Sequence, residues 1–406
     1  MKYLVLLTTS YPFGKREPFI ESEIRYIRGF DKIIIFSSRA EDEVREIKSV
    51  SAIDYYRINA FKDNYSKRIP KLFFSKLFYK ELYNLIVTKR LCVYNIKWLV
   101  RTTLIALNTY SRAKKIIREK YDSFLTDNVT YYSYWLSDHA MAAILLKKKF
   151  GGKKVVSRAH RTDLYEEEDI AGYIPYRQFL LKHLDYVVPI SEDGANYLNK
   201  YDTGVKIHLS RLGVVDNGVN PPQCEDSTII VSCSWCRPVK RIDKLILALS
   251  LIRNKKITWV HIGNGELFNK LQEQAASMLP ENVSAIFLGE MSNEDILNYY
   301  RTHHIDIFVN VSSSEGVPVS IMEALSFGIP VIATDVGGTS EAVVSGVNGL
   351  LIPRDFPTEL LVNSIVKLID MPTRDMGLLR KGCRTFWEQN YLAEKNYREF
   401  NEFLNF

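Results

Sequence analysis

Short apolar runs recur along the whole chain, and segments of helical length and mixed polarity separate them. Gly, Pro or polar turn residues bound the runs, which is typical of βαβ units whose parallel sheets are buried on both faces. The strands expected in the first half are 3–8, 32–37, 123–127, 154–157, 186–190 and 206–210. Those expected in the second half are 228–234, 257–263, 285–289, 305–310, 330–334 and 349–352. The pattern therefore predicts an α/β protein with two Rossmann-like halves.

A stretch rich in Gly, Pro, Asn and Asp lies between the two halves, over residues 212–227. This composition is typical of a domain boundary. We therefore expect an N-terminal domain over 1–211 and a C-terminal domain over 212–385, with a ligand cleft between them. No run approaches the roughly 18 apolar residues of a membrane span, and the first apolar run turns polar too soon for a signal peptide.

The composition is that of an ordinary globular protein, with 406 residues, 46% hydrophobic and 25% charged. An odd number of cysteines makes a disulfide framework implausible and favours free thiols in a reducing cytosol. Cys233 and Cys236 form a C-x-x-C, but no second ligand pair accompanies it, so a zinc or redox site is disfavoured. The cysteines are Cys92, Cys224, Cys233, Cys236 and Cys383.

Two carboxylates, Glu315 and Glu323, stand eight positions apart around a predicted helix start, with Pro318 suited to its first turn. A helix N-terminus offers unpaired N–H groups and a positive dipole end, so a diphosphate is expected over Gly316 and Val317. Glu323 then lies roughly 7.5 Å beyond Pro318, at about 1.5 Å rise per residue. Acids on both sides of a diphosphate suit a nucleotide sugar.

The pattern E-x7-E, followed by G-x-P-V-I-A-T-D-x-G-G-x-x-E and ending at Glu341, resembles the retaining nucleotide-sugar glycosyltransferases of family 4, which have the GT-B fold. In that family the first acid contacts the transferred hexose, which the resemblance carries onto Glu315 as a catalytic residue. The second acid binds the ribose hydroxyls, which implies this role for Glu323. Gly337, Gly338 and Glu341 resemble the turn that faces the donor.

The resemblance also implies that a final helix, 386–406, crosses back to pack on the first domain. No D-x-D with acidic neighbours stands out at a strand end. We therefore expect no metal and no cofactor beside the nucleoside diphosphate sugar itself, so that the helix dipole, a lysine and backbone amides stabilise the leaving group.

Cations follow the first strand of the second half. Lys240 is expected to bind the donor diphosphate, and the family usually shows an arginine five positions before this lysine. Here that position is Trp235, so Arg237 is the candidate that would replace the missing cation. Gly263 and Gly265, after the next strand, resemble the loop on the nucleotide side.

In the first domain, His160, Arg161 and Asp163 follow a predicted strand, at the edge where ligands of open α/β sheets bind. The loop resembles the histidine loop that the family directs at the donor hexose. The neutral imidazole or the backbone carbonyl of His160 would support charge that builds up at the anomeric carbon. Asp163 would orient the ring or bind the acceptor together with Arg161.

Further acceptor-side candidates follow the first strand and the predicted strand near residue 130. Gly14 and Glu17 lie in a loop that resembles the family's acceptor loop. His139, with Trp135 and Asp138, offers sugar-stacking and hydrogen-bonding groups. For these three residues a place in the helix core is an equally good interpretation.

The positive charge is concentrated in residues 62–120, where fifteen Lys or Arg accompany three acids, a net +12 that leaves −5 for the remainder of the +7 chain. Aromatic and aliphatic residues alternate with these cations in helical fashion. The block therefore predicts docking to an anionic membrane surface, although a domain core with a solvated lysine face fits the same pattern. Nucleic acid is disfavoured, because no DNA- or RNA-binding motif accompanies the charge.

Together these features predict a retaining, metal-independent hexosyltransferase that uses a nucleoside diphosphate sugar. They resemble enzymes of capsule, exopolysaccharide or O-antigen synthesis, of the amylovoran and colanic-acid type, which act on polyprenyl-diphosphate-linked glycans at the cytoplasmic face of the membrane. A non-catalytic sugar-nucleotide-binding partner of another transferase is the alternative, because of Trp235. A Rossmann oxidoreductase would need G-x-G-x-x-G after the first strand, where only Gly14 stands.

Overall fold

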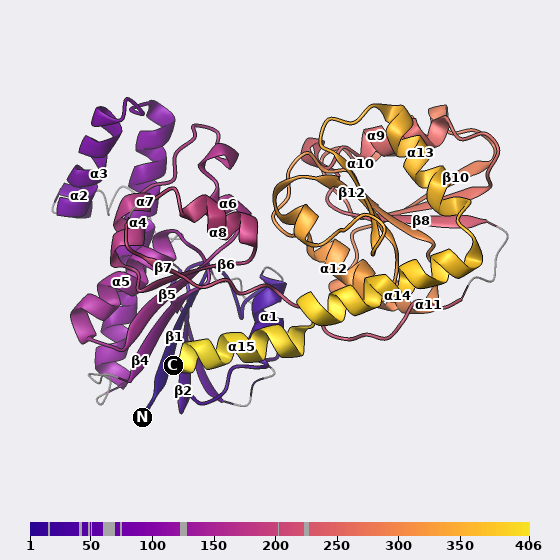
Figure 1. Cartoon of the computed structure of the whole chain (residues 1–406). Coiled ribbons are helices and arrows are strands. Elements are labelled where there is room, and N and C mark those ends of the chain that lie inside the picture. Colours follow the sequence, from indigo (N-terminus) through magenta and orange to yellow (C-terminus); the bar gives the residue numbers. More distant parts are fainter. Residues whose placement is uncertain are drawn as a thin grey trace. The chain divides into compact units, whose positions relative to one another are not determined.

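The computed structural model describes residues 1–14, 17–39, 43–47, 49, 51–59, 70–73, 75–121, 128–201, 203–222 and 227–406. The chain forms two compact units (Figure 1). One contains residues 1–212 and 396–406, and the other contains residues 213–395. Each unit is built on one sheet, and every pairing between the named strands is parallel. The prediction of two Rossmann-like parallel sheets is confirmed.

The N-terminal unit has a seven-stranded sheet in the order β3-β2-β1-β4-β5-β6-β7. Its strands are β1 Tyr3–Thr8, β2 Lys32–Ser37, β3 Ala52–Arg57, β4 Val129–Ser133, β5 Lys154–Ala159, β6 Tyr186–Pro189 and β7 Lys206–Ile207. The sequence did not predict β3, because this edge strand is only partly buried and mixes polar with apolar residues. The strand expected at 123–127 lies outside the described residues, and β4 begins after them, at Val129.

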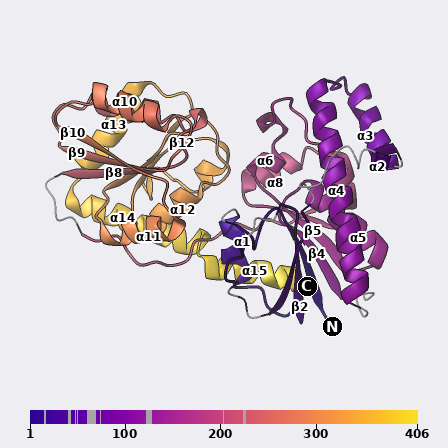
Figure 2. The same cartoon turned by 180° about the vertical axis from the view of Figure 1, so that it is seen from behind.

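Helices cover both faces of this sheet (Figures 1 and 2). Successive residues of a strand point to opposite faces, so Val5 and Leu7 pack in one apolar core and Leu4 and Leu6 in another. The first core includes side chains of α4 and α5, and the second includes those of α1 and α15. The helices are α1 Pro18–Ile24, α2 Pro70–Phe73, α3 Lys76–Val87, α4 Val93–Lys120, α5 Asp138–Phe150, α6 Arg161–Leu164, α7 Arg177–His183, α8 Glu192–Leu198 and α15 Ala393–Asn405.

A buried ion pair ties this sheet to the helices of the second core. Arg158 of β5 is fully buried, and its Nη2 lies 2.8 Å from Oε2 of Glu23 on α1. The Arg158 guanidinium also lies 4.1 Å from the centre of the Phe400 ring on α15. Neither charged group has access to water, so removal of either residue would leave the other as an unpaired buried charge.

The C-terminal unit has a six-stranded sheet in the order β10-β9-β8-β11-β12-β13. Its strands are β8 Thr228–Cys233, β9 Ile257–Ile262, β10 Val283–Gly289, β11 Ile307–Asn310, β12 Val331–Asp335 and β13 Gly349–Pro353. All six match the expected apolar runs to within two residues. The helices are α9 Ile242–Ser250, α10 Phe268–Met278, α11 Asn293–Thr302, α12 Val319–Ser326, α13 Thr358–Ile369 and α14 Thr373–Asn390, with 3-10 turns η3 Pro238–Lys240 and η4 Gly337–Glu341.

The segment expected as one final helix, 386–406, consists of two elements in the structure. Helix α14 continues to Asn390, and α15 begins at Ala393. The break arises because Val214 donates its N–H to the Tyr391 carbonyl (2.9 Å) and accepts from the N–H of Ala393 (3.1 Å). The part of α15 that belongs to the N-terminal unit begins at Asn396.

Within the described part of the chain, no helix is both long and apolar enough to cross a bilayer.

Candidate functional site

The predicted donor-side residues lie in loops that leave the carboxyl ends of β8, β9, β11 and β12. Strands β8 and β11 are neighbours, and β9 lies on the other side of β8, so the strand order reverses there. Ligands of open α/β sheets bind at the carboxyl edge, at such a switch point. Lys240 follows β8 and Glu315 follows β11, so the two flank this point.

Lys240 and Glu315 form an ion pair. The Lys240 Nζ lies 2.5 Å from Oε1 of Glu315, and Asn310 Nδ2 donates to the same oxygen at 3.4 Å. Glu315 is only 8% exposed. A buried carboxylate needs a partner of opposite charge, and Lys240 supplies it. The structure thus brings together two residues that are 75 positions apart in the sequence.

Arg241 supports the loop that carries Glu315. Its Nε donates to the Val311 carbonyl (2.7 Å) and its Nη2 to the Ser312 carbonyl (3.0 Å). Its Nη1 donates to the Arg354 carbonyl (2.8 Å). Three carbonyls from two loops therefore fix this guanidinium. The sequence did not predict these contacts, because it offers no signal for pairs so far apart in the chain.

The predicted glycines allow the loops to approach one another. A Cβ on Gly337 would lie 2.0 Å from the Glu315 carbonyl oxygen, and its φ is +50°. A Cβ on Gly263 would lie 2.0 Å from the Ser234 carbonyl oxygen, with φ at +138°. Only glycine fits such contacts and backbone angles. The turn η4, which includes the buried Gly338 and the half-buried Glu341, therefore packs on the backbone of the Glu315 loop.

Gly265 likewise allows a close approach to the loop after β8. A Cβ on Gly265 would lie 2.8 Å from the Cys236 carbonyl oxygen. The Cys236 Sγ lies 3.3 Å from Nε2 of His261, whose Nδ1 lies 2.9 Å from Ser232 Oγ. Burial lowers the pKa of His261 to about 4, so the ring is neutral. Cys233 and Cys236 are both free thiols, and Cys224 lies outside the described residues.

Glu323 lies on α12, whose N-terminal cap is Pro318, and is only 6% exposed. Asn293 Nδ2 on α11 donates to its Oε1 at 2.6 Å. Burial outweighs this hydrogen bond and raises the pKa of Glu323 to about 7. Glu323 is therefore not a solvated helix residue. A carboxylate in this setting gains from further hydroxyl donors, such as a ribose diol.

Trp235, where the family pattern has arginine, is 53% exposed. The Arg237 guanidinium is also exposed and lies 5.8 Å from the centre of the Trp235 ring. Gly316 is half-buried and Val317 is buried, immediately before α12. Among the described residues no three His, Cys, Asp or Glu side chains cluster so that they could hold a metal ion.

In the N-terminal unit, the His160 ring packs against two aromatic rings, with centroid distances of 4.8 Å to Tyr134 and 4.6 Å to Trp135. Asp163 accepts from the backbone N–H groups of His160 (2.5 Å) and Leu136 (2.7 Å). Its Oδ2 lies 3.9 Å from His160 Nδ1, too far for a hydrogen bond. Asp163 therefore positions the His160 backbone, while stacking positions the ring.

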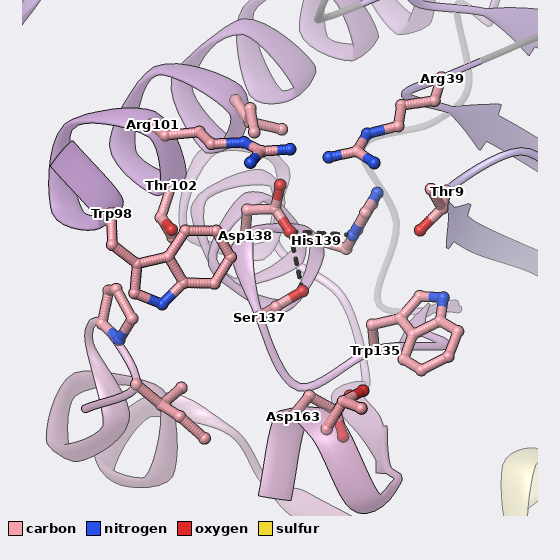
Figure 3. A pocket seen from close by; sticks show the side chains of 14 residues that line it. Thr9, Arg39, Trp98, Arg101, Thr102, Trp135, Ser137, Asp138, His139 and Asp163 are labelled. Carbon is pink, nitrogen blue, oxygen red and sulfur yellow. Dashed lines mark hydrogen bonds and ion pairs between the residues drawn. The ribbon is translucent and has the colours of Figure 1, made fainter. Parts of the chain in front are cut away.

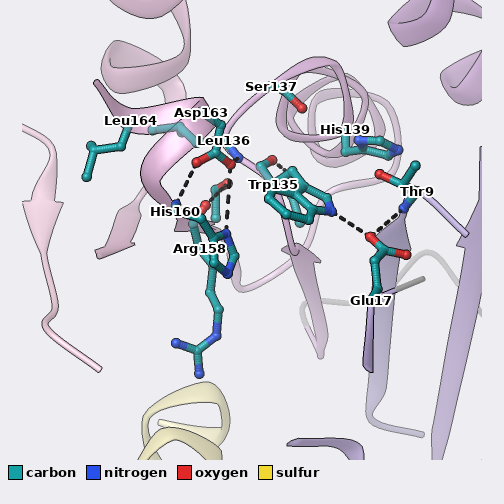
Figure 4. Close-up of polar contacts among 12 residues, drawn as sticks. Thr9, Glu17, Trp135, Leu136, Ser137, His139, Arg158, His160, Asp163 and Leu164 are labelled. Carbon is teal, nitrogen blue, oxygen red and sulfur yellow. Dashed lines mark hydrogen bonds and ion pairs between the residues drawn. The ribbon is translucent and has the colours of Figure 1, made fainter. Parts of the chain in front are cut away.

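Glu17 organises the loop after β1, which also contains Gly14. Its carboxylate accepts from the N–H groups of Thr9 (3.0 Å), Ser10 (2.7 Å) and Tyr11 (2.8 Å) and from Trp135 Nε1 (2.5 Å). Burial alone would raise the pKa of Glu17, but these hydrogen bonds outweigh it and hold the pKa below its usual value. The loop and the Trp135 indole are thus fixed to one carboxylate (Figure 4).

His139 is buried at the start of α5. Its Nε2 lies 2.8 Å from Ser38 Oγ and its Nδ1 lies 3.1 Å from Oδ1 of Asp138. Burial alone lowers the pKa of His139, but the Asp138 carboxylate outweighs burial and raises it. Arg161, the remaining predicted residue, is paired with Glu168.

A pocket of about 360 Å³ opens beside His139, within the N-terminal unit (Figure 3). It adjoins the loops after β1, β2, β4 and β5, which is the carboxyl edge of the N-terminal sheet. The sequence did not single out three of its residues, Arg39, Trp98 and Arg101, since nothing local distinguishes them from other basic and aromatic positions. The lining residues are Thr9, Arg39, Trp98, Arg101, Thr102, Ile105, Trp135, Ser137, Asp138, His139, Thr162, Asp163, Ile174 and Pro175.

Residues 220–382, which contain every donor-side candidate, match the family model of the glycosyl transferases group 1. Residues 220–382 are a group 1 glycosyltransferase domain. An uncharacterized glycosyltransferase of Methanocaldococcus jannaschii is 26% identical over 315 residues, 76% of this chain and 83% of that protein. The O-antigen biosynthesis glycosyltransferase WbnH of Escherichia coli is 37% identical over 150 residues, 36% of this chain and 41% of that protein.

Solved glycosyltransferase structures resemble the whole chain. The Anabaena protein HepE, in complex with UDP and glucose, matches with a TM-score of 0.66 and 16% identity, over 100% of this chain and 99% of that one. At this identity the likeness establishes the fold, which is GT-B. The glycosyltransferase domain thus belongs to a GT-B chain, as the sequence pattern predicted.

Proposed function

We propose that the protein is a retaining hexosyltransferase of family 4 that takes its sugar from a nucleoside diphosphate sugar. The observation that carries the proposal is the pair of buried acids at the carboxyl edge of the C-terminal sheet. Glu315 is ion-paired with Lys240, and Glu323 lies eight residues further on with its pKa raised to about 7. The group 1 domain, and the UDP and glucose bound by the structurally similar HepE, support the same conclusion.

In the proposed reaction Lys240 leaves Glu315 for the donor diphosphate, and Glu315 accepts hydrogen bonds from the hexose hydroxyls. The amides at Gly316 and Val317 and the start of α12 stabilise the leaving charge. The bond from the anomeric carbon to the diphosphate breaks, and the acceptor oxygen bonds to the same face. The acceptor proton passes to the leaving phosphate oxygen. No step requires a metal or a further cofactor.

Two substitutions test the site. Glu323→Ala is expected mainly to raise the KM for the donor, because it removes ribose contacts present in both ground and transition states. Glu315→Ala is expected mainly to lower kcat, because hexose contacts strengthen as charge develops. Glu273→Ala, an exposed acid on α10, is the matched control. Unchanged kinetics in both active-site variants would remove the assignment.

The donor can be found by measuring thermal stabilisation across a set of nucleotide sugars. A ligand at 100 times its dissociation constant adds about 2.7 kcal/mol to the folded state. Donor hydrolysis or transfer by the purified protein separates an enzyme from the alternative, a non-catalytic sugar-nucleotide-binding subunit. Trp235 in place of the expected arginine is the observation that favours the alternative.

The acceptor in this proposal is a polyprenyl-diphosphate-linked glycan of capsule, exopolysaccharide or O-antigen synthesis, as in enzymes of the amylovoran and colanic-acid type, and the protein acts at the inner face of the cytoplasmic membrane. The O-antigen role in the name of WbnH supports the pathway. A surface of the N-terminal unit supports the location. This docking face consists of exposed apolar residues at the end of α2, on α3, in the connection between α3 and α4, and at the start of α4: Phe73, Tyr79, Tyr83, Ile86, Val87, Leu91, Val93 and Tyr94.

Exposed lysines accompany the docking face at positions 76, 80, 89 and 97. The only acid between residues 75 and 97 is Glu81, which is buried and accepts from the Tyr173 hydroxyl at 2.9 Å. Near an anionic membrane each lysine contributes about 1 kcal/mol, and the apolar residues add insertion energy. Residues 62–69 and 74 of the basic block lie outside the described residues.

Flotation with anionic liposomes tests this location. Binding is expected to weaken with salt and to fall in a Tyr83→Ser, Val87→Ser double variant. An Ile286→Ser, Leu288→Ser variant, which removes exposed apolar residues of the C-terminal unit, is the control. Equal flotation of both variants, or no flotation of the parent protein, would contradict membrane docking.

A further inference from the structure

A second pocket of the N-terminal unit, of about 320 Å³, is lined by residues of α3, α7 and the 3-10 turn η2 Glu166–Glu168. We call it the α3–α7 pocket. Ile174 lines both this pocket and the one beside His139. Arg90, which also lines it, belongs to the connection between α3 and α4 that carries Leu91 of the docking face. The α3–α7 pocket therefore adjoins both the acceptor-side residues and the docking face.

Arg177, at the start of α7, lines the pocket and is a buried cation without an ion pair among the described residues. It is only 3% exposed. Its Nη2 donates to the carbonyls of Asp163 (2.7 Å) and Leu164 (2.9 Å). Nε and Nη1 carry the remaining N–H groups, and neither has a hydrogen-bond partner in the described part of the chain. Buried donors without partners are costly, so these groups favour a ligand that supplies oxygen atoms.

The carboxylates of the pocket argue against an anion as that ligand. Glu166 is already paired with Arg90, at 2.9 Å. Glu81 is buried, and its Oε1 accepts from the Tyr173 hydroxyl at 2.9 Å, whereas its Oε2 has no hydrogen-bond partner within the described ranges. The wall thus offers N–H donors from Arg177 and a carboxylate acceptor from Glu81. Hydroxyl groups satisfy both, but an anion would be repelled by Glu81.

The other lining residues suit a sugar ring. The side-chain amides of Asn84 and Gln178 have no partner among the residues that the structure describes, and each amide can donate and accept. The Tyr201 hydroxyl donates to Oε1 of Glu166 at 2.9 Å, which fixes an aromatic ring in the wall. Such a ring offers apolar surface to the C–H groups of a sugar. The volume lies at the small end of ligand pockets, which span about 300–1,000 Å³.

We propose that the α3–α7 pocket binds a neutral sugar unit of the acceptor glycan, away from the unit that receives the hexose. Arg177 donates to oxygen atoms of this sugar, Glu81 accepts from one of its hydroxyl groups, and the two amides bind at the rim. Because the pocket adjoins the docking face, the bound unit lies on the lipid side of the glycan. The proposal rests on the proposed function, because it names a second contact with the same acceptor.

Saturation-transfer difference NMR on the whole protein tests the proposal without transfer. UDP is kept in excess so that it fills the donor site. The probes are the methyl glycosides of glucose, galactose, N-acetylglucosamine and N-acetylgalactosamine at constant ionic strength. At least one glycoside should bind, and inorganic phosphate at the same concentration should not displace it.

An Asn84→Ala, Gln178→Ala variant should bind that glycoside at least about fivefold more weakly, because two hydrogen bonds are lost. Arg177→Gln should abolish binding. Asn196→Ala, which removes an exposed amide of α8 outside the pocket, should leave the affinity unchanged. The double variant retains the contacts of Arg177 with the two carbonyls, so its result decides the question even if Arg177→Gln does not fold.

Circular dichroism and UDP binding should be the same in the double variant and the parent protein. Three results overturn the proposal: no glycoside binds, the double variant binds as tightly as the parent, or inorganic phosphate displaces the glycoside. Failure of UDP to bind the parent protein would instead refute the proposed function.

Discussion

Replacing Glu323 with glutamine should stabilise the ligand-free protein while it weakens donor binding. The carboxyl is buried, and its pKa is raised from 4.5 to about 7. The folded state therefore binds the proton more tightly than the unfolded chain does. This contribution to stability is complete below pH 4.5 and is lost as the pH rises to about 7. At 1.36 kcal/mol per pH unit, the loss is about 3 kcal/mol.

Glutamine mimics the protonated carboxyl and still accepts from Asn293, so Glu323→Gln should avoid this loss. The free energy of unfolding of the variant, relative to the parent, is expected to rise by about 3 kcal/mol between pH 4.5 and pH 8. For a unit of this size that is about 6–12 °C in Tm. Denaturation of both proteins over this pH range, without ligand, measures the difference.

Glu273→Gln, which changes an exposed acid of the same unit, should give no such pH-dependent difference. The same titrations in the presence of UDP should favour the parent protein, because ribose hydroxyls bind the ionised carboxylate. A stability difference that does not change with pH would refute the reasoning on burial. Equal UDP affinity would refute the ribose contact.

Three further predictions concern other positions. Gly337→Ala should weaken UDP binding by about tenfold or more, measured by calorimetry, because the added Cβ would lie 2.0 Å from the Glu315 carbonyl oxygen. Lys240→Met should lower kcat by about 10²–10³-fold in a transfer assay, because it removes a cation from the leaving diphosphate. Arg158→Met should destabilise the N-terminal unit by about 3–5 kcal/mol in denaturant unfolding, because it leaves Glu23 buried without its partner.

Each of these three substitutions has a matched control. Gly346 also has a positive φ, +80°, but no atom lies near its Cβ direction, so Gly346→Ala separates backbone strain from the clash. Lys256→Met removes an exposed cation far along the chain from Lys240 and should leave kcat unchanged. An added Glu23→Leu change should recover part of the stability lost in Arg158→Met. Equal UDP binding by Gly337→Ala and Gly346→Ala would contradict the argument from the clash, and equal kcat of Lys240→Met and Lys256→Met would contradict the role of Lys240. No recovery of stability on adding Glu23→Leu would contradict the argument from the buried ion pair.

The sequence was sufficient for the features that local patterns encode. Buried strands form apolar runs between turn residues, so all six strands of the C-terminal sheet were predicted. The partly exposed edge strand β3 lacks such a run. Likewise, the spacing of Glu315 and Glu323 identified two acids around a helix start, because both belong to one local motif.

The contacts that complete the site were not predictable from the sequence alone. Asn293 reaches Glu323 from another helix, and Arg241 binds carbonyls about 70 residues away. Arg39 and Arg101 meet only because the loop after β2 and helix α4 approach the same edge of the sheet. Such contacts depend on tertiary packing, so they cannot be inferred from a single sequence before the fold is known.

In the proposed mechanism, the ion pair between Lys240 and Glu315 also affects how the nucleoside diphosphate product leaves the site. A nucleoside diphosphate without its hexose would attract Lys240 but would offer no hexose hydroxyl to Glu315. Its binding would therefore leave the buried Glu315 carboxylate without a partner. A complete donor compensates both partners. Re-formation of the Lys240–Glu315 ion pair would therefore favour dissociation of the nucleoside diphosphate product. The site would then be free to bind the next nucleoside diphosphate sugar.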